Sequence, residues 1–319
     1  MLNFLRSNQP FYFIVSVLAI LALSLCFQYL NYDLRGYIIP FKIFAKVPLV
    51  VNYLLLSSLI FFTSFKINRV VNKSVLFPKS FYLPGFLYLL FMTFYSPVHY
   101  LFFPTISNLL IVMAMGEFFQ IYRNESCKNK IFKANLYLFL STLFSPFNIL
   151  LVPISWIILF IIRPFEIREY IMPLIVLLMF SLYIVPFGLI NGQLNSWIYN
   201  WWNSLTNYST LPSKLLLTNY ILFFSVGFIF SINPISRTFI SSNNRYKKII
   251  WVIISLLFFS LLISIISGLS FKPYIPYLYP FFIPICIIIS NGMIRSRVKW
   301  VIDIFLFLFI IFIVITNII

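Results

Sequence analysis

The chain is poor in the side chains that most catalytic and metal-binding sites require. Its 319 residues include six Asp and Glu, one His and three Cys. Cys26, Cys127 and Cys286 make an odd set, and no disulfide framework follows from it. An iron enzyme that acts on lipid chains needs several His ligands, whereas His99 is alone. The sequence also lacks a phosphate-binding glycine loop, a nucleophile elbow and metal-spaced cysteines, so it contains no recognisable metal-binding motif.

Apolar residues are abundant instead. They make up 62% of the chain and give a mean hydropathy of +1.00, more than a soluble fold can bury. The runs are continuous and lack the alternation of barrel strands, so we expect an all-α, polytopic transmembrane bundle. No gap is long enough for a soluble domain, so residues 1–319 form one integral membrane domain. About eleven spans are predicted, near residues 11–30, 47–65, 81–98, 104–122, 134–146, 147–162, 171–190, 214–233, 249–268, 277–292 and 300–318.

Positive charges fall in alternate gaps between these segments. Eighteen of the 23 Lys and Arg residues lie before the first segment or in every second gap, and five lie in the other gaps. Basic residues near span ends resist translocation, so we expect a cytoplasmic N-terminus and a periplasmic C-terminus. The net charge of +17 is spread over these connections without a basic arm or a nucleic-acid-binding module. It therefore predicts attraction to membrane lipids that are anionic, and no nucleic acid partner.

Residues 134–162 leave the topology open at one point. Ser145–Pro146 and Pro153 interrupt the apolar run, which then forms either two short spans or one re-entrant hairpin. Both arrangements return the chain to the cytoplasm.

The longest predicted periplasmic gap, residues 191–213, contains no charge. Its Trp and other apolar residues recur at helical spacing, which predicts an interfacial periplasmic helix over residues 193–208. Trp197 and Trp201 then either belong to an aromatic belt at the headgroups or stack on sugar rings.

Asp33 is the only acidic residue predicted on the outer side. A carboxylate there can act as a general base toward an acceptor hydroxyl, or hold a divalent cation against a phosphate. Alternatively, it pairs with Arg35 or caps a short helix. His99, at the third outer turn, is either an acid or base or an interfacial polar residue.

Four prolines between residues 273 and 284 prevent an ordinary helical entry into the tenth segment. Membrane proteins tolerate such backbone near a cavity or ligand, and Lys272 could there meet a lipid-linked phosphate. The alternative is a bent, tightly packed helix.

Two predicted cytoplasmic regions contain acidic side chains. In residues 163–170 we expect Pro164 in the first turn of a helix and an ion pair between Arg163 and Glu166. Glu117 lies six residues before Arg123; it either extends toward the cytoplasm or, if buried, needs a partner or marks a proton site.

Two resemblances add to these patterns. Residues 128–146, followed by 163–170, resemble an uncharacterised multi-pass inner-membrane family of Bacteroidota, which implies a bacterial inner (cytoplasmic) membrane location. Residues 272–280 are similar to the late outer-side segment of GT-C glycosyltransferases, which use polyprenyl-phosphate sugars. Those enzymes also carry an acidic residue after the first span, where Asp33 stands. This chain departs from them because its first outer loop has only about sixteen residues and the second acidic partner is missing.

The leading hypothesis is a GT-C-like transferase that takes a sugar from a polyprenyl-phosphate carrier at the periplasmic face. Its catalytic base is Asp33, and its cofactor, if it has one, is a divalent cation. The alternative is a non-enzymatic carrier or scaffold subunit of cell-envelope biogenesis or transport. The predicted substrate-binding residues are Lys272, Tyr274, Trp197, Trp201, Arg35 and His99.

Overall fold

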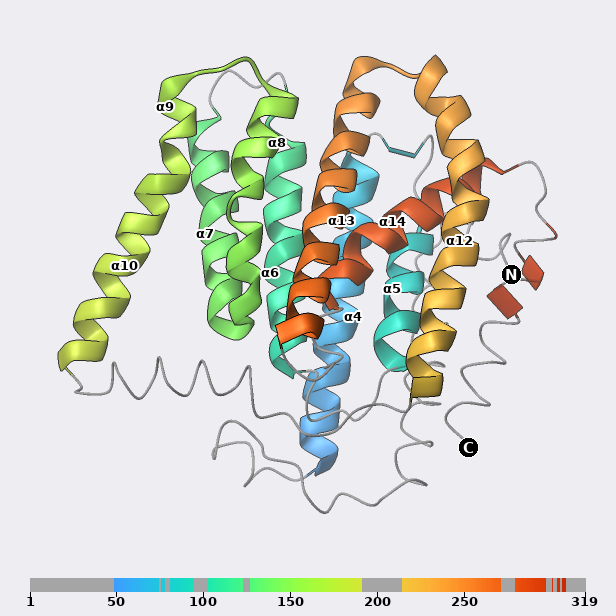
Figure 1. Cartoon of the computed structure of the whole chain (residues 1–319), viewed down its shortest axis with the longest axis horizontal. Coiled ribbons are helices and arrows are strands. Elements are labelled where there is room, and N and C mark those ends of the chain that lie inside the picture. The colour runs from blue at the N-terminus through green and yellow to red at the C-terminus, as the bar shows by residue number, and fades with distance from the viewer. Residues whose placement is uncertain are drawn as a thin grey trace.

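The computed structural model describes the chain from residue 49 onward, with gaps. Within the described part all regular structure is helical and no strand occurs, which confirms the all-α prediction (Figure 1). The described residues are 49–74, 76–77, 81–94, 102–122, 127–190, 214–270, 279–296, 300, 303–304 and 306–307.

Each of the predicted segments between residues 47 and 292 coincides with helical structure. The boundaries differ: α4 continues to Lys73 and α12 to Ser241, so both extend past their apolar parts. Lys73 in the last turn of α4 is favourable because the C-terminal end of a helix is partially negative. The helices are α4 (Leu49–Lys73), α5 (Leu83–Phe94), α6 (Phe102–Phe119), α7 (Lys128–Phe144), η2 (Pro146–Leu151), α8 (Ile154–Ile162), α9 (Ile167–Tyr170), α10 (Met172–Ile190), α12 (Lys214–Ser241), α13 (Asn244–Ser270) and α14 (Tyr279–Arg295).

Two of these helices are long and apolar enough to cross a membrane, judged by length and composition. They contain the windows Leu54–Lys73 in α4 and Asn244–Ile265 in α13. Shorter apolar helices of 10–17 residues, the class to which α14 belongs, also occur in the described part of the chain. At 1.5 Å per residue, the 17 residues of α14 extend about 26 Å, slightly less than the hydrocarbon thickness of a bilayer.

Helix α14 lies at the centre of the bundle. Every residue from Tyr279 to Met293 is buried, and the helix contacts α5, α6, α12 and α13. In Figure 1 it runs obliquely among the more upright helices. A Cβ atom on Gly292 would lie 2.4 Å from the Cα atom of Ser231, so α12 and α14 touch through their backbones. Small residues are what allow such close helix packing in membrane proteins.

The start of α5 is held by side chains of α4. Asn68 Oδ1 accepts a hydrogen bond from the Gly85 amide at 2.7 Å, and Ser64 Oγ donates to the Gly85 carbonyl at 2.8 Å. Asn72 forms two hydrogen bonds with the backbone of Phe81. A Cβ atom on Gly85 would approach the Ser64 carbonyl to 2.5 Å, so glycine is required there. These bonds satisfy backbone groups that a helix start leaves without partners.

Residues 128–162 form the two helices α7 and α8, joined by η2, which contacts both of them (Figure 1). The helix breaks at Ser145, whose extended backbone precedes Pro146. Asn148 of η2 donates to Ser107 Oγ of α6, and Ser107 Oγ donates to the Ser141 carbonyl at 3.3 Å. The turn is therefore fixed to the neighbouring helix α6, as a proline-interrupted pair of short helices requires.

Large apolar side chains cover much of the outside of the bundle. On α10 alone, eight of them are exposed, and Leu182 keeps 69% of its surface accessible. The interior contains many buried Asn, Ser and Thr side chains. The core is mostly apolar as well, so both the inside and much of the outside of the described bundle are apolar, whereas the outside of a water-soluble protein carries mainly polar residues.

Candidate functional site

The predicted outer-side site residues fall outside the described part of the chain, as does the predicted interfacial helix over residues 193–208. The described residues that border the predicted substrate-binding residues Lys272 and Tyr274 are Ser270, which ends α13, and Tyr279, which begins α14. The predicted site residues concerned are Asp33, Arg35, His99, Trp197, Trp201, Lys272 and Tyr274.

A buried polar cluster surrounds the start of α14. Asn108 of α6 donates to the Tyr88 hydroxyl and to the Tyr279 carbonyl, both at 3.1 Å. Tyr88 is also hydrogen-bonded to Thr63 of α4. The Oδ1 atom of Asn108 is buried and has no hydrogen-bond partner among the described residues. This cluster joins four helices and holds the chain in place within the proline-rich segment, at Tyr279.

A second polar network lies at the other end of α14. Arg295 donates to the Leu76 carbonyl at 2.7 Å and to Asn291 Oδ1 at 2.8 Å. Its guanidinium lies 4.8 Å from the centre of the Tyr246 ring, and the Tyr246 hydroxyl accepts a hydrogen bond from Asn291. The ends of α4, α13 and α14 are thereby fastened together.

The C-terminal ends of α6 and α8 and the N-terminal end of α13 lie at the same end of the bundle as Arg295. Lys248 of α13 donates to the Ile162 carbonyl at 2.8 Å, at the last residue of α8. Lys248 and Arg245 also lie over the ring of Tyr122, at 5.7 and 5.9 Å from its centre. Connections that are far apart in the sequence therefore bring their basic residues to one end of the bundle.

The ion pair predicted between Arg163 and Glu166 is wrong: Arg163 pairs with Glu169 instead. The prediction assumed that a helix begins at Pro164, but the backbone is extended at Arg163 and Glu166, and α9 begins only at Ile167. Extended spacing takes Glu166 to the surface, where it is exposed. Burial raises the pKa of the Glu169 carboxyl above its usual value, although the charge of Arg163 acts in the opposite direction.

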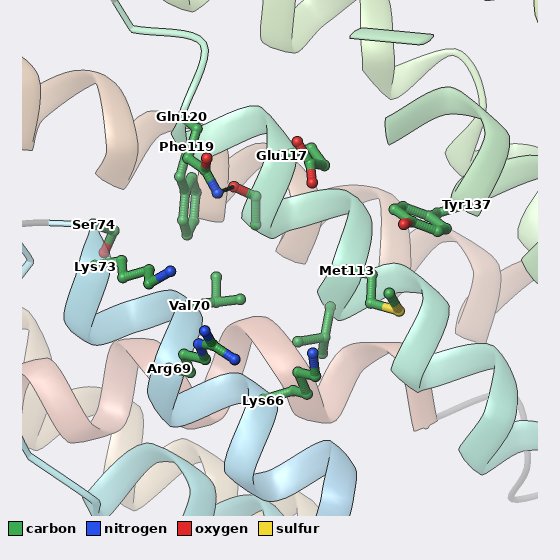
Figure 2. Close-up of a pocket in the computed structure, with 12 residues that line it drawn as sticks. Lys66, Arg69, Val70, Lys73, Ser74, Met113, Glu117, Phe119, Gln120 and Tyr137 are labelled. Atoms are coloured by element: carbon green, nitrogen blue, oxygen red, sulfur yellow. Dashed lines mark hydrogen bonds between the residues drawn. The ribbon is translucent and has the colours of Figure 1, made fainter. Parts of the chain in front are cut away.

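A cavity of about 260 Å³ opens between the C-terminal halves of α4 and α6. Lys66, Arg69 and Lys73 line it from α4, and Glu117 and Gln120 line it from α6 (Figure 2). Residues three or four apart lie on one face of a helix, so the three cations of α4 share one face. The remaining lining residues are Val70, Ser74, Val112, Met113, Gly116, Phe119 and Tyr137.

Sequence reasoning treated these three cations only as topology signals. Their spacing of three and four residues could have shown that they share a face, but their cavity depends on the packing of α6 against α4. Glu117 was expected to extend toward the cytoplasm or to need a partner. It is half-buried in the wall of the basic cavity.

Within the described residues, no group of three or more His, Cys, Asp or Glu side chains is arranged to hold a metal ion.

Comparison of the chain with models of protein families, with curated proteins and with solved structures finds no match.

Proposed function

We propose that the chain is a multi-pass inner-membrane protein with about eleven spans and a cytoplasmic N-terminus. The observation that supports this most directly is the apolar outer surface of the bundle, which carries many exposed large apolar side chains, while Asn side chains in the interior are hydrogen-bonded. A lipid environment accounts for both because the exposed side chains then face acyl chains and backbone polar groups are paired internally.

The basic end of the bundle supports the proposed orientation. Arg295, Lys248 and Arg245 come from predicted cytoplasmic connections and make their contacts at one end. Basic residues gathered at one membrane face are retained in the cytoplasm.

Cysteine labelling tests the orientation. In a chain without Cys26, Cys127 and Cys286, single cysteines are introduced as Asn243→Cys, between α12 and α13, and Asn203→Cys, in the predicted periplasmic gap. In cells whose outer membrane is permeabilised, an impermeant maleimide should label the second position, and label the first only after the inner membrane is also opened. The reverse pattern would refute the proposed sidedness.

For the reaction, we propose transfer of a sugar from a polyprenyl-phosphate carrier, as predicted from the sequence. The acceptor hydroxyl oxygen would bond to the anomeric carbon of the sugar while the bond from that carbon to the phosphate oxygen breaks. Asp33 would take the hydroxyl proton, and the polyprenyl phosphate would leave with Lys272 close to its charge. One structural observation favours this role for the proline-rich segment: Asn108 anchors Tyr279, within that segment, in the core.

The matching experiment measures sugar transfer from a polyprenyl-phosphate donor in membranes that contain the full chain. Asp33→Asn should lower the rate by at least a hundredfold, the size of effect expected for a general base. Lys42→Gln, in the same predicted outer gap but outside the predicted site, serves as the control for expression and folding. Full activity of Asp33→Asn, or no transfer by the native chain, would favour the carrier or scaffold alternative.

A further inference from the structure

We propose that the cavity between α4 and α6 binds the phosphate of an anionic phosphate ester. This site is at the basic end of the bundle and is separate from the outer-side residues predicted for sugar transfer. It therefore goes beyond the proposed function and does not depend on any reaction.

The charges that line the cavity are concentrated and remain available for a ligand. Lys66, Arg69 and Lys73 approach it from one helix face, as Figure 2 shows. Among the residues that the structure describes, no carboxylate lies within ion-pair distance of these three cations. Lys66 instead has its ammonium group 5.2 Å from the centre of the Phe62 ring. Charges that only fixed the topology would not need to converge on a cavity.

The sum of the charges matches a phosphate group. Three cations and the carboxylate of Glu117 leave a formal charge of about +2, and a phosphate monoester carries about −1.5 to −2 near neutral pH. Arg69 supplies a planar fork of N–H donors, whereas the two lysines are compact point charges. Glu117 on the opposite wall can accept a hydrogen bond from a hydroxyl next to the phosphate.

The wall of the cavity is closely packed at its glycine. A Cβ atom on Gly116 would lie 3.0 Å from Val70 Cγ2, so a larger residue would push α4 and α6 apart or displace Val70. The Gln120 amide donates to the Gly116 carbonyl at 3.1 Å and keeps this turn of α6 in place. Ser74 and Tyr137 add hydroxyl groups to the lining. The volume of about 260 Å³ suits a headgroup rather than a whole lipid.

Two sources of phosphate ester have this chemistry. One is an anionic lipid, whose acyl chains would remain beside α4, and basic pockets between membrane helices do bind lipid headgroups. The other is a soluble phosphate ester from the cytoplasm. The two differ in whether a headgroup without acyl chains binds.

The test measures binding of fluorescent phosphatidic acid to the full chain in phosphatidylcholine nanodiscs at 0.15 M ionic strength, the physiological value. The triple variant Lys66→Gln, Arg69→Gln, Lys73→Gln should weaken binding at least tenfold. The control is Lys133→Gln, Arg168→Gln, Arg237→Gln, three exposed residues whose loss changes the net charge equally. We expect less than a twofold effect from the control. Equal losses in both variants, or none in either, would refute the site.

Two further measurements keep the result independent of folding and identify the source. The first is a charge-retaining triple variant, Lys66→Arg, Arg69→Lys, Lys73→Arg, which should bind the probe within threefold of the native chain. If this variant unfolds at the native temperature but binds more weakly than that, a charge-based site is refuted.

The second measurement, competition with glycerol phosphate, distinguishes the two sources of phosphate ester. Displacement of the probe assigns a soluble ester, and persistence of the probe assigns a lipid, whereas absence of binding by either ligand to the native chain overturns the proposal.

Discussion

Helices α14 and α10 are both largely apolar but occupy opposite positions in the bundle. Residues Tyr279 to Met293 of α14 are all buried, whereas most of the α10 residues whose burial is described are exposed, and this helix contacts mainly α7 among the described helices. The contact with α7 includes Phe180 and Phe139, whose ring centres are 5.7 Å apart. In Figure 1, α10 lies at the edge of the bundle and α14 crosses its middle. Hydrophobicity places a helix in the membrane, but small and polar residues decide whether other helices surround it.

The largest expected effect comes from emptying the core beside α14. Phe282→Ala removes a fully buried ring that stacks on Phe91, with ring centres 5.8 Å apart. We expect a loss of about 4 kcal/mol in the free energy of unfolding, because the cavity stays partly empty. Leu182→Ala in α10 should cost less than about 0.5 kcal/mol. Unfolding of the purified chain in mixed micelles measures both, and equal losses would contradict the contrast between the two helices.

The next effect tests the close approach of α12 and α14. Gly292→Ala places a methyl group against the backbone of Ser231, so the helices must separate. We expect a loss of about 3 kcal/mol, at the upper end for an overpacked site. The same unfolding measurement applies, and Ser181→Ala in α10, whose hydroxyl bonds only the Leu178 carbonyl of its own helix, is the matched control. A native-like Gly292→Ala protein would show that the two backbones are not in contact.

The smallest effect concerns the basic residues at the ends of the two helices. Arg295→Gln, at the end of α14, loses hydrogen bonds to Leu76 and Asn291 and the contact with the Tyr246 ring. We expect a loss of about 2 kcal/mol because charged hydrogen bonds at a partly buried site are lost. Arg168→Gln, shortly before α10, removes an exposed cation and should be nearly neutral. Thermal unfolding followed by tryptophan fluorescence distinguishes them, and similar melting temperatures for both variants would remove the contrast.

The sequence predicted the helices well because long apolar runs leave few alternatives for the backbone. It did not predict which helices and residues contact one another. Ser290, Asn291 and Gly292 are a local signal for a buried interface, yet nothing in their spacing identifies Ser231 and Tyr246 as the residues they touch. The predicted Arg163–Glu166 pair failed for a related reason, since an extended stretch replaced the assumed helix.

The basic cavity likewise could not be predicted from the sequence, because it is formed by two helices. Lys66, Arg69 and Lys73 are visible in the sequence as charges near the end of an apolar run. Their relation to Glu117 depends on the packing of α6 against α4, which Gly116 permits. Long-range packing of this kind cannot be obtained from one sequence by periodicity alone.

The central position of α14 also has a consequence for biosynthesis. Ribosomes deliver the chain from its N-terminus, so α5, α6, α12 and α13 are synthesised before the helix that they surround. Until α14 has been made, the Asn108 amide and the Ser231 hydroxyl lack their α14 partners, and the slot that they border must be closed by neighbouring helices. Completion of this bundle is therefore a late event, and the nascent protein depends on α14 to become native.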